Sequence, residues 1–244
     1  MRLNITIPCY NEEKILNNNV IELFNFLNKN IVEDDWQIII ADNGSNDQTA
    51  KIAQELSKKF KQIKYLFIPK KGKGRAIKLS WQKFKADVYI FMDADLSTDL
   101  KALPELINSI KNENYDLAIG SRFHKKSKTN RIIIRKFVSY GYQLIKKIIL
   151  GSKISDLPCG FKAVNKEIIK KIVPKIKDNE WFFDSELLLL SEHFGYQIKE
   201  IPIKWEDIRE KQDRSRVKVV SLSLKYFKNI LELKKRIKKL YGQK

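Results

Sequence analysis

Two aspartates separated by a single residue give the strongest chemical signal in this 244-residue sequence. Asp93 and Asp95 directly follow Val88–Met92, an apolar run of the kind that forms a buried strand. Two carboxylates at a strand end supply the oxygen ligands that hard divalent cations prefer. Such a cation would bridge the phosphates of a nucleotide and neutralise a leaving diphosphate. The spacing alone favours a solvated acidic turn, but the position at the binding edge of a sheet favours a metal site.

Two further segments have residue types that suit a nucleotide. Asp42 ends a second apolar run, and its carboxylate there can accept hydrogen bonds from a base or ribose. The alternative is an Asx turn, with Asp47 capping the next helix. The segment Lys71–Arg75 mixes two glycines with three basic residues ahead of a helical pattern. Backbone N–H groups and a helix N-terminus suit phosphate, whereas an ordinary basic turn is the alternative.

Alternating strands and helices position these segments in the first half of the chain. Predicted strands cover residues 3–7, 37–41, 64–68, 88–92 and 115–119, and predicted helices cover 12–28, 48–60, 75–84 and 100–111. This order predicts an α/β protein with a doubly wound, mainly parallel sheet. Polar turns follow the strands at residues 8–12, 42–47, 93–99 and 120–122. They fall at the carboxyl edge, where ligands bind in such sheets.

The second half of the sequence is less regular. We predict a basic amphipathic segment at 132–150, a loop at 155–162, a helix at 182–194 and a strand at 197–203. A second basic amphipathic segment, 217–244, has apolar residues at helical spacing.

Composition and charge limit the class of protein. Lys and Arg number 48 against 29 Asp and Glu, a net charge of +19, which indicates polyanionic partners. No nucleic-acid-binding signature accompanies this charge, so we expect no nucleic-acid partner, and no G-x-G-x-x-G follows the first strand, which argues against a dinucleotide-binding oxidoreductase. Two cysteines, Cys9 and Cys159, indicate a reducing compartment. Because the sequence shows no membrane span or signal peptide, we expect a cytoplasmic protein.

Seven motifs together resemble the family 2 glycosyltransferases, which have a GT-A fold. They are Pro8–Glu13, Asp42–Asp47, Lys73-Gly74, Asp93-Ala94-Asp95, Gly120–Arg122, Cys159–Lys162 and Phe183–Leu187. The last three are most similar to dolichyl- and polyprenyl-phosphate hexosyltransferases, the glucosyltransferase branch more than the mannosyltransferase branch. The resemblance covers about residues 3–216 and implies a catalytic domain over residues 1–216, which the basic amphipathic segment 217–244 follows.

The resemblance also implies roles for individual residues. The base and ribose would be lined by Pro8, Tyr10, Glu12 and Asp42. The rest of the nucleotide-sugar would be bound by Lys73, Lys162, Arg214 and Arg216, and Mg²⁺ or Mn²⁺ by Asp93 and Asp95. The phosphate of the acceptor lipid would be bound by Arg122, Arg135 and Ser139. Two positions depart from the family pattern: Asn43 replaces a common aspartate, and Ser97 replaces a third metal ligand.

The implied reaction is inverting transfer of a hexose, with glucose from UDP-glucose favoured, to a dolichyl or polyprenyl phosphate. An anionic phosphate oxygen needs no strong base, so catalysis would reduce to alignment and stabilisation of the leaving diphosphate. The alternatives are a GDP-mannose-dependent mannosyltransferase and a family 2 enzyme acting on a glycan hydroxyl. In the latter, Asp184 would be the catalytic base, unless it only caps a helix. The aromatic run Trp181–Phe183 favours core packing over a sugar platform.

The two basic amphipathic segments, 132–150 and 217–244, are typical of helices that lie in the interface of an anionic membrane. The alternative is a helix packed on the domain with a solvated basic face. We therefore expect peripheral association with the cytoplasmic face of a membrane, through these helices or through a membrane-protein partner.

Overall fold

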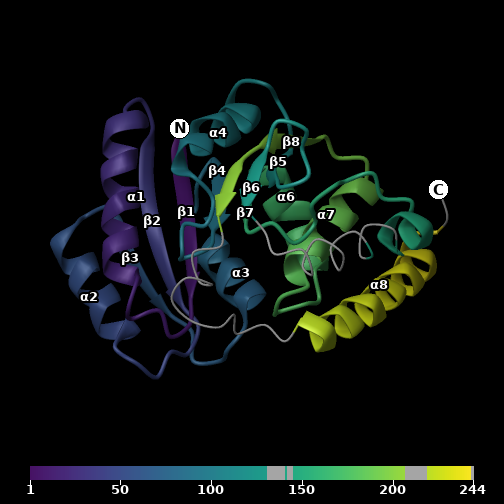
Figure 1. Cartoon of the computed structure of the whole chain (residues 1–244), viewed down its shortest axis with the longest axis horizontal. Coiled ribbons are helices and arrows are strands. Elements are labelled where there is room, and N and C mark those ends of the chain that lie inside the picture. Colours follow the sequence, from purple (N-terminus) through teal and green to yellow (C-terminus); the bar gives the residue numbers. More distant parts are fainter. Residues whose placement is uncertain (131–140, 142–144, 207–218, 243–244) are drawn as a thin grey trace.

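A seven-stranded sheet forms the centre of the molecule (Figure 1). The computed structural model describes residues 1–130, 141, 145–206 and 219–242. The strand order is β3-β2-β1-β4-β7-β5-β8. The strands are β1 (Arg2–Cys9), β2 (Asp35–Asp42), β3 (Ile63–Phe67), β4 (Val88–Met92), β5 (Leu117–Ser121), β7 (Phe161–Asn165) and β8 (Ile198–Pro202). Only the pairs made by β7 are antiparallel, so the predicted mainly parallel α/β sheet is confirmed.

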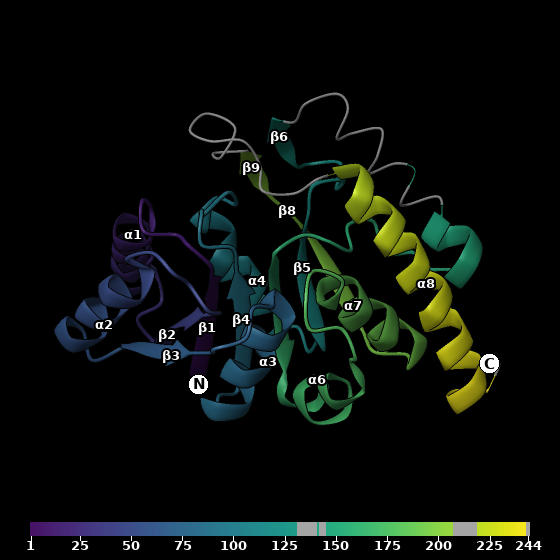
Figure 2. The same ribbon diagram turned by 90° about the horizontal axis from the view of Figure 1, so that it is seen from below.

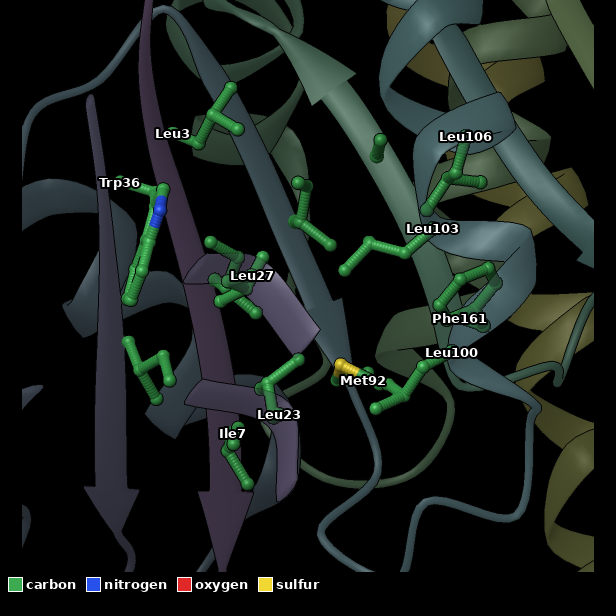
Figure 3. Packing of buried hydrophobic residues seen from close by; sticks show 14 of the residues in the cluster. Leu3, Ile7, Leu23, Leu27, Trp36, Met92, Leu100, Leu103, Leu106 and Phe161 are labelled. Atoms are coloured by element: carbon green, nitrogen blue, oxygen red, sulfur yellow. The ribbon is translucent and has the colours of Figure 1, made fainter. Parts of the chain in front are cut away.

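Helices cover both faces of this sheet. One face is covered by α1 (Leu16–Asn30), α2 (Thr49–Lys59) and α4 (Leu103–Lys111), which follows the short helix η1 (Leu100–Ala102). Figure 3 shows this core, where Leu23 and Leu27 of α1 lie over β1 and Leu103 and Leu106 of α4 lie beside Phe161. The other face is covered by α3 (Lys73–Lys83), α6 (Lys166–Lys171), η2 (Val173–Lys175) and α7 (Phe183–His193). Burial on both faces explains the continuous apolar runs 38–41 in β2 and 88–92 in β4.

Strand β7 was not predicted, because its sequence does not read as a buried strand. Phe161 and Ala163 pack into one core and Val164 into the other, but Lys162 interrupts the apolar run. The predicted loop over 155–162 is therefore wrong at its end, where Phe161 and Lys162 enter the sheet between β4 and β5. The burial of a lysine here depends on a carboxylate from another element, which a local pattern does not reveal.

Helix α8 (Val219–Tyr241) packs along the outside of α7 (Figure 2). Tyr226, Ile230 and Leu233 of α8 are buried in the same core as α7. Residues 145–150 are also helical, and Ile145 packs against this core. The described parts of both basic segments thus place apolar residues on the domain, as in the packed-helix alternative. Among the described helices, none is both long enough and apolar enough to cross a membrane.

A small two-stranded sheet stands beside the carboxyl edge of the main sheet. It pairs β6 (Lys128–Asn130) with β9 (Lys204–Glu206) in parallel. Trp205 of β9 also forms an isolated bridge with Thr98, and the Glu206 amide donates to the Ser97 carbonyl at 2.9 Å. These contacts tie β9 to the loop that follows Asp95.

Candidate active site

A buried network of alternating charges lies at the carboxyl end of β4. The Lys73 ammonium is 2.9 Å from Oδ1 of Asp93 and 3.2 Å from Oδ2 of Asp184. The other oxygen of Asp184 accepts a hydrogen bond from Lys162 at 3.1 Å. The Asp184 side chain is only 2% exposed. The structure therefore joins β4, the start of α3, β7 and the start of α7 through one set of ion pairs.

The network fixes the protonation state of Lys73. Burial by itself lowers the pKa of this lysine, but the charges of Asp184 and Asp93 outweigh burial and raise the pKa above its ordinary value. Lys73 is therefore a cation at neutral pH, beside Asp93. A fixed charge inside a site of low dielectric stabilises developing negative charge without reorganisation during the reaction.

Lys162 differs from its predicted role. Its side chain is fully buried, and its ammonium donates to the carbonyls of Leu157 and Cys159 as well as to Asp184. These three acceptors occupy its three N–H groups. Direct contact between Lys162 and a diphosphate therefore does not agree with the structure. Lys162 instead holds Asp184 and the 157–160 loop in place.

Asp184 does not cap α7, so that alternative is wrong. The Phe183 amide at the start of the helix donates to Asp178 at 3.1 Å, while Asp184 faces the lysines. The three aromatic residues 181–183 differ in their surroundings. Phe182 and Phe183 are core residues, whereas Trp181 is 44% exposed. The Lys73 ammonium lies 5.6 Å from the centroid of the Trp181 ring, which places the indole at the rim of the network.

Gly160 allows Asp93 to pack closely against β7. The Asp93 amide donates to the Gly160 carbonyl at 3.2 Å. A Cβ atom on residue 160 would lie 2.1 Å from Oδ2 of Asp93, well inside contact distance. Only glycine fits at this position without displacing the carboxylate.

Asp93 and Asp95 are suited to a divalent cation that is also bound by its ligand. The Asp93 side chain is 43% exposed, and Oδ1 of Asp95 accepts from the Ser97 amide at 3.1 Å. The part of the chain that the structure describes has no group of three or more His, Cys, Asp or Glu placed to hold a metal. Mg²⁺ is commonly held by one or two carboxylates, with phosphate oxygens and waters completing its shell. The two aspartates fit that pattern.

Arg122 is fixed at the end of β5 by a residue that the sequence analysis did not single out. Its Nε and Nη2 groups each donate to a different oxygen of Asp156 at 2.7 Å. The guanidinium also lies 5.5 Å from the centroid of the Trp205 ring. Burial lowers the pKa of Arg122, but the charge of Asp156 outweighs it, so the pKa is raised. Asp156 lies 34 residues from Arg122, so only the fold reveals the pair.

The predicted nucleoside residues gather at the ends of β1 and β2. Pro8 of β1 pairs in register with Ala41, and the Glu12 amide donates to Thr49 at 2.7 Å. Lys71 lies over the Tyr10 ring, 3.6 Å from its centroid. The structure thus brings the Pro8–Glu12 turn and the glycine-rich loop to one place.

Asp42 has the local contacts of the Asx-turn alternative. It is fully buried, and it accepts from the Ser45 amide at 2.9 Å and from the Tyr65 hydroxyl at 3.2 Å. Burial and the Asp42 charge raise the pKa of Tyr65 to about 12. A ligand contact from Asp42 would therefore add to these two hydrogen bonds, since each carboxylate oxygen can accept more than one.

Asn43 uses both ends of its amide. Its Oδ1 accepts from the Gly72 amide at 2.9 Å, and its Nδ2 donates to the Cys9 carbonyl. An aspartate at this position could not make the second bond. The departure from the family pattern thus links β1 to the glycine-rich loop.

Four predicted binding residues lie outside the described residues: Arg135, Ser139, Arg214 and Arg216. Their predicted roles stay predictions.

Comparison with known proteins shows the family. The model for glycosyl transferase family 2 matches residues 4–173. Glycosyltransferase AglD of Haloferax volcanii is 29% identical over 207 residues, which are 84% of this chain and 33% of that protein. The dolichyl-phosphate beta-glucosyltransferase of Saccharomyces cerevisiae is 30% identical, covering 94% of this chain and 73% of the yeast protein. The human protein of that name is also 30% identical, covering 85% of this chain and 68% of its own length.

A solved structure shows the same fold. The UDP complex of glucosyl-3-phosphoglycerate synthase from Mycobacterium tuberculosis aligns with a TM-score of 0.72 at 17% identity, covering 96% of this chain and 80% of the synthase. At this identity the likeness concerns the fold alone, and it agrees with the mainly parallel sheet and its helices. The chain belongs to glycosyl transferase family 2 and has a GT-A fold.

Proposed function

We propose that this glycosyltransferase moves a hexose from a nucleotide-sugar to a dolichyl or polyprenyl phosphate, with inversion at the anomeric carbon. Glucose from UDP-glucose is the favoured donor group. The relatives named dolichyl-phosphate beta-glucosyltransferase support this choice, since their similarity extends over most of the chain. The UDP complex of the structural neighbour supports a uridine nucleotide.

The position of Asp184 carries the proposal. Both of its oxygens interact with ammonium groups, of Lys73 and Lys162, and the side chain is almost fully buried. A general base must reach the proton that it removes, whereas Asp184 is 2% exposed and each of its oxygens is engaged by a lysine. An acceptor that already has an anionic oxygen requires no such base. The geometry therefore favours a phosphate acceptor over a glycan hydroxyl.

In the proposed reaction, an oxygen of the lipid phosphate attacks the anomeric carbon from the face opposite the nucleotide. A new carbon–oxygen bond forms while the bond to the nucleoside diphosphate breaks, and the electron pair leaves with the diphosphate. No proton transfer is required. Lys73 would supply fixed positive charge near the leaving group, and the fold would align the two substrates.

Asp93 and Asp95 would hold Mg²⁺ or Mn²⁺. When bound, the cation would neutralise negative charge on the diphosphate. Structural neighbours were solved with Mn²⁺ or Mg²⁺ together with UDP, which supports this assignment. Nucleotide-sugar binding by the following residues is part of the same proposal: Pro8, Tyr10, Glu12, Asp42, Lys73, Arg214 and Arg216.

Arg122 would bind the acceptor phosphate. Asp156 engages its Nε and Nη2 groups and so fixes the plane of the guanidinium. Within the described part of the chain, no hydrogen bond engages Nη1, which leaves donors for an anion. Arg135 and Ser139 are proposed to complete this phosphate site.

We further propose that the catalytic domain, residues 1–216, meets its lipid at the cytoplasmic face of a membrane, with the 217–244 helix or a membrane-protein partner assisting. Phe227 and Leu231 of α8 are exposed large apolar side chains, and Lys228 lies between them. Apolar residues among lysines favour an anionic membrane surface.

The reaction is tested by incubating the protein with labelled UDP- and GDP-sugars and a short polyprenyl phosphate, with Mg²⁺, Mn²⁺ or EDTA. We expect metal-dependent labelling of the lipid, highest with UDP-glucose. Labelling by GDP-mannose instead would replace the donor assignment. If no donor labels the lipid although nucleotide still binds, the acceptor assignment is wrong.

Replacing Gly160 tests the close packing at Asp93. We expect Gly160→Ala to lower the transfer rate by about a hundredfold, since small displacements of a catalytic group have effects of this size. Gly141→Ala is the matched control, because a Cβ at Gly141 meets nothing within 4 Å among the described residues. Rates and melting temperatures of the two variants would be compared. Equal activity would contradict the proposed role of Gly160.

A further inference from the structure

The segment 176–182 links the C-terminal helix to the glycine-rich loop. On its inner side, the Gly74 amide donates to the Glu180 carbonyl at 3.1 Å, and the Arg75 amide donates to the Asn179 carbonyl at 2.9 Å. A Cβ on Gly74 would lie 3.2 Å from the carbonyl carbon of Asn179, so the two pieces of chain are in direct contact. Lys73 lies within this loop, and its position therefore depends on the 176–182 segment.

Helix α3 adds a second tie to the same segment. Lys78, five residues along α3 from Lys73, donates to the carbonyls of Ile176 at 3.3 Å and Asp178 at 3.0 Å. The 176–182 segment is thus bonded to α3 both near its start, through Ile176 and Asp178, and further along, through residues 179 and 180. A shift of one would be transmitted to the other.

The outer side of the segment is held by α8. The Tyr226 hydroxyl donates to the Trp181 carbonyl at 2.8 Å, and the Tyr226 ring packs edge-on against Phe182 with centroids 5.5 Å apart. Further along α8, Arg236 forms an ion pair with Glu186. Both side chains are shielded, with Arg236 14% and Glu186 3% exposed.

Glu186 connects Arg236 of α8 to the 176–182 segment. Its two oxygens accept from the amides of Lys177 at 3.0 Å and Asp178 at 2.8 Å. A buried carboxylate requires compensation of its charge, and among the described residues its ion-pair partner is Arg236. Without Arg236, Glu186 would lose its ion-pair partner at the base of the segment and would keep the two amide hydrogen bonds.

We propose that Arg236 and Tyr226 of α8 are positioning residues that hold segment 176–182 and, through it, Lys73 and Trp181 at the donor end of the active site. The exposed indole of Trp181 beside Lys73 offers an apolar face for the ring of a sugar. The inference about the donor rests on the proposed function. The inference that α8 holds the glycine-rich loop in place is independent of the proposed function.

Amide hydrogen exchange tests the hold without any substrate. In Arg236→Gln, we expect the amides of Gly74 and Arg75 to exchange about tenfold faster, because their acceptors lie in the released segment. Lys228→Gln is the matched control on the same helix, since Lys228 is 78% exposed and its ion-pair partner among the described residues is Glu232, at 3.9 Å. Arg236→Lys should restore protection. Unchanged exchange in Arg236→Gln would overturn the proposal.

Kinetics with the labelled donor then separate positioning from stability. In Arg236→Gln, we expect the KM for the donor to rise about tenfold while the KM for polyprenyl phosphate changes little. If Arg236→Gln fails to fold, Tyr226→Phe serves instead, because it removes only the hydroxyl and keeps the ring against Phe182. A parallel loss for donor and acceptor would contradict the assignment to the donor end. Absence of transfer by the unchanged protein would refute the proposed function, while the exchange result would still decide on the hold.

Discussion

Asp95→Asn is expected to abolish metal-dependent transfer while the fold is retained. A Lewis-acid metal contributes several kcal/mol, so a rate loss of about a thousandfold is expected at about 1.4 kcal/mol per factor of ten. The fold should persist because Asp95 accepts a hydrogen bond from the Ser97 amide through Oδ1, which an asparagine retains. Transfer rate, melting temperature and UDP affinity with Mg²⁺ or EDTA would be measured.

Asp99→Asn is the matched control for this variant. Asp99 lies four residues beyond Asp95, and its Oδ1 likewise accepts a backbone hydrogen bond, from Lys101 at 3.0 Å. We expect Asp99→Asn to keep both transfer and the dependence of UDP affinity on Mg²⁺. Full activity of Asp95→Asn, or equal losses in the two variants, would contradict a specific metal role for Asp95.

Asp184→Asn is expected to weaken both the fold and the reaction. Removing one charge from a buried ion pair typically costs about 3–5 kcal/mol of stability. Here the loss of stability should be about 3 kcal/mol. Lys73 would still pair with Asp93, and Lys162 would still donate to the carbonyls of Leu157 and Cys159. The transfer rate should fall by about a hundredfold or more, since Lys73 would lose one of the two carboxylates that fix its position. Urea unfolding and initial rates would measure the two effects.

A double variant separates these effects. Asp184→Asn combined with Lys162→Met removes the lysine that would otherwise be buried without a charged partner, so stability should recover while transfer stays low. Recovery of both would mean that Asp184 serves only the fold. An Asp184→Asn variant with normal stability would contradict the buried network itself.

The same network predicts a dependence of stability on pH. The pKa of Lys73 is raised in the folded state, so its ion pairs stabilise the protein below the ordinary lysine pKa and lose this effect as the pH rises above about 10.5. The difference in stability between the unchanged protein and Asp184→Asn should therefore be full at pH 7 and decrease above pH 10.5.

Local patterns predicted the frame of the site. The apolar run Val88–Met92 and the aspartates after it predict β4 and the two carboxylates at its end without long-range information, because a buried strand and the turn that follows it are local features. Helix α1 was predicted to begin at Glu12 but begins at Leu16. The Glu12 amide instead donates to Thr49, a residue 37 positions away.

The parts of the site that were not predicted depend on distant partners. Lys162 in β7 is buried because Asp184 lies beside it, and Asp156 matters because Arg122 reaches it. From its residue type alone, each of these charged residues would be expected on the protein surface. Asp184 resembled a helix cap by its position in the sequence. Only the fold shows that Asp178 accepts the hydrogen bond from the Phe183 amide at the start of α7.

The most direct test of the central claim is a comparison of two acceptors, a polyprenyl phosphate and the polyprenol of the same length that lacks the phosphate. Labelled UDP-glucose and Mg²⁺ would be supplied to both, and the labelled lipid would be quantified. We predict transfer to the phosphate and none to the alcohol, because Asp184 is held by two lysines and is not placed to remove a hydroxyl proton. Comparable transfer to the alcohol would contradict the account.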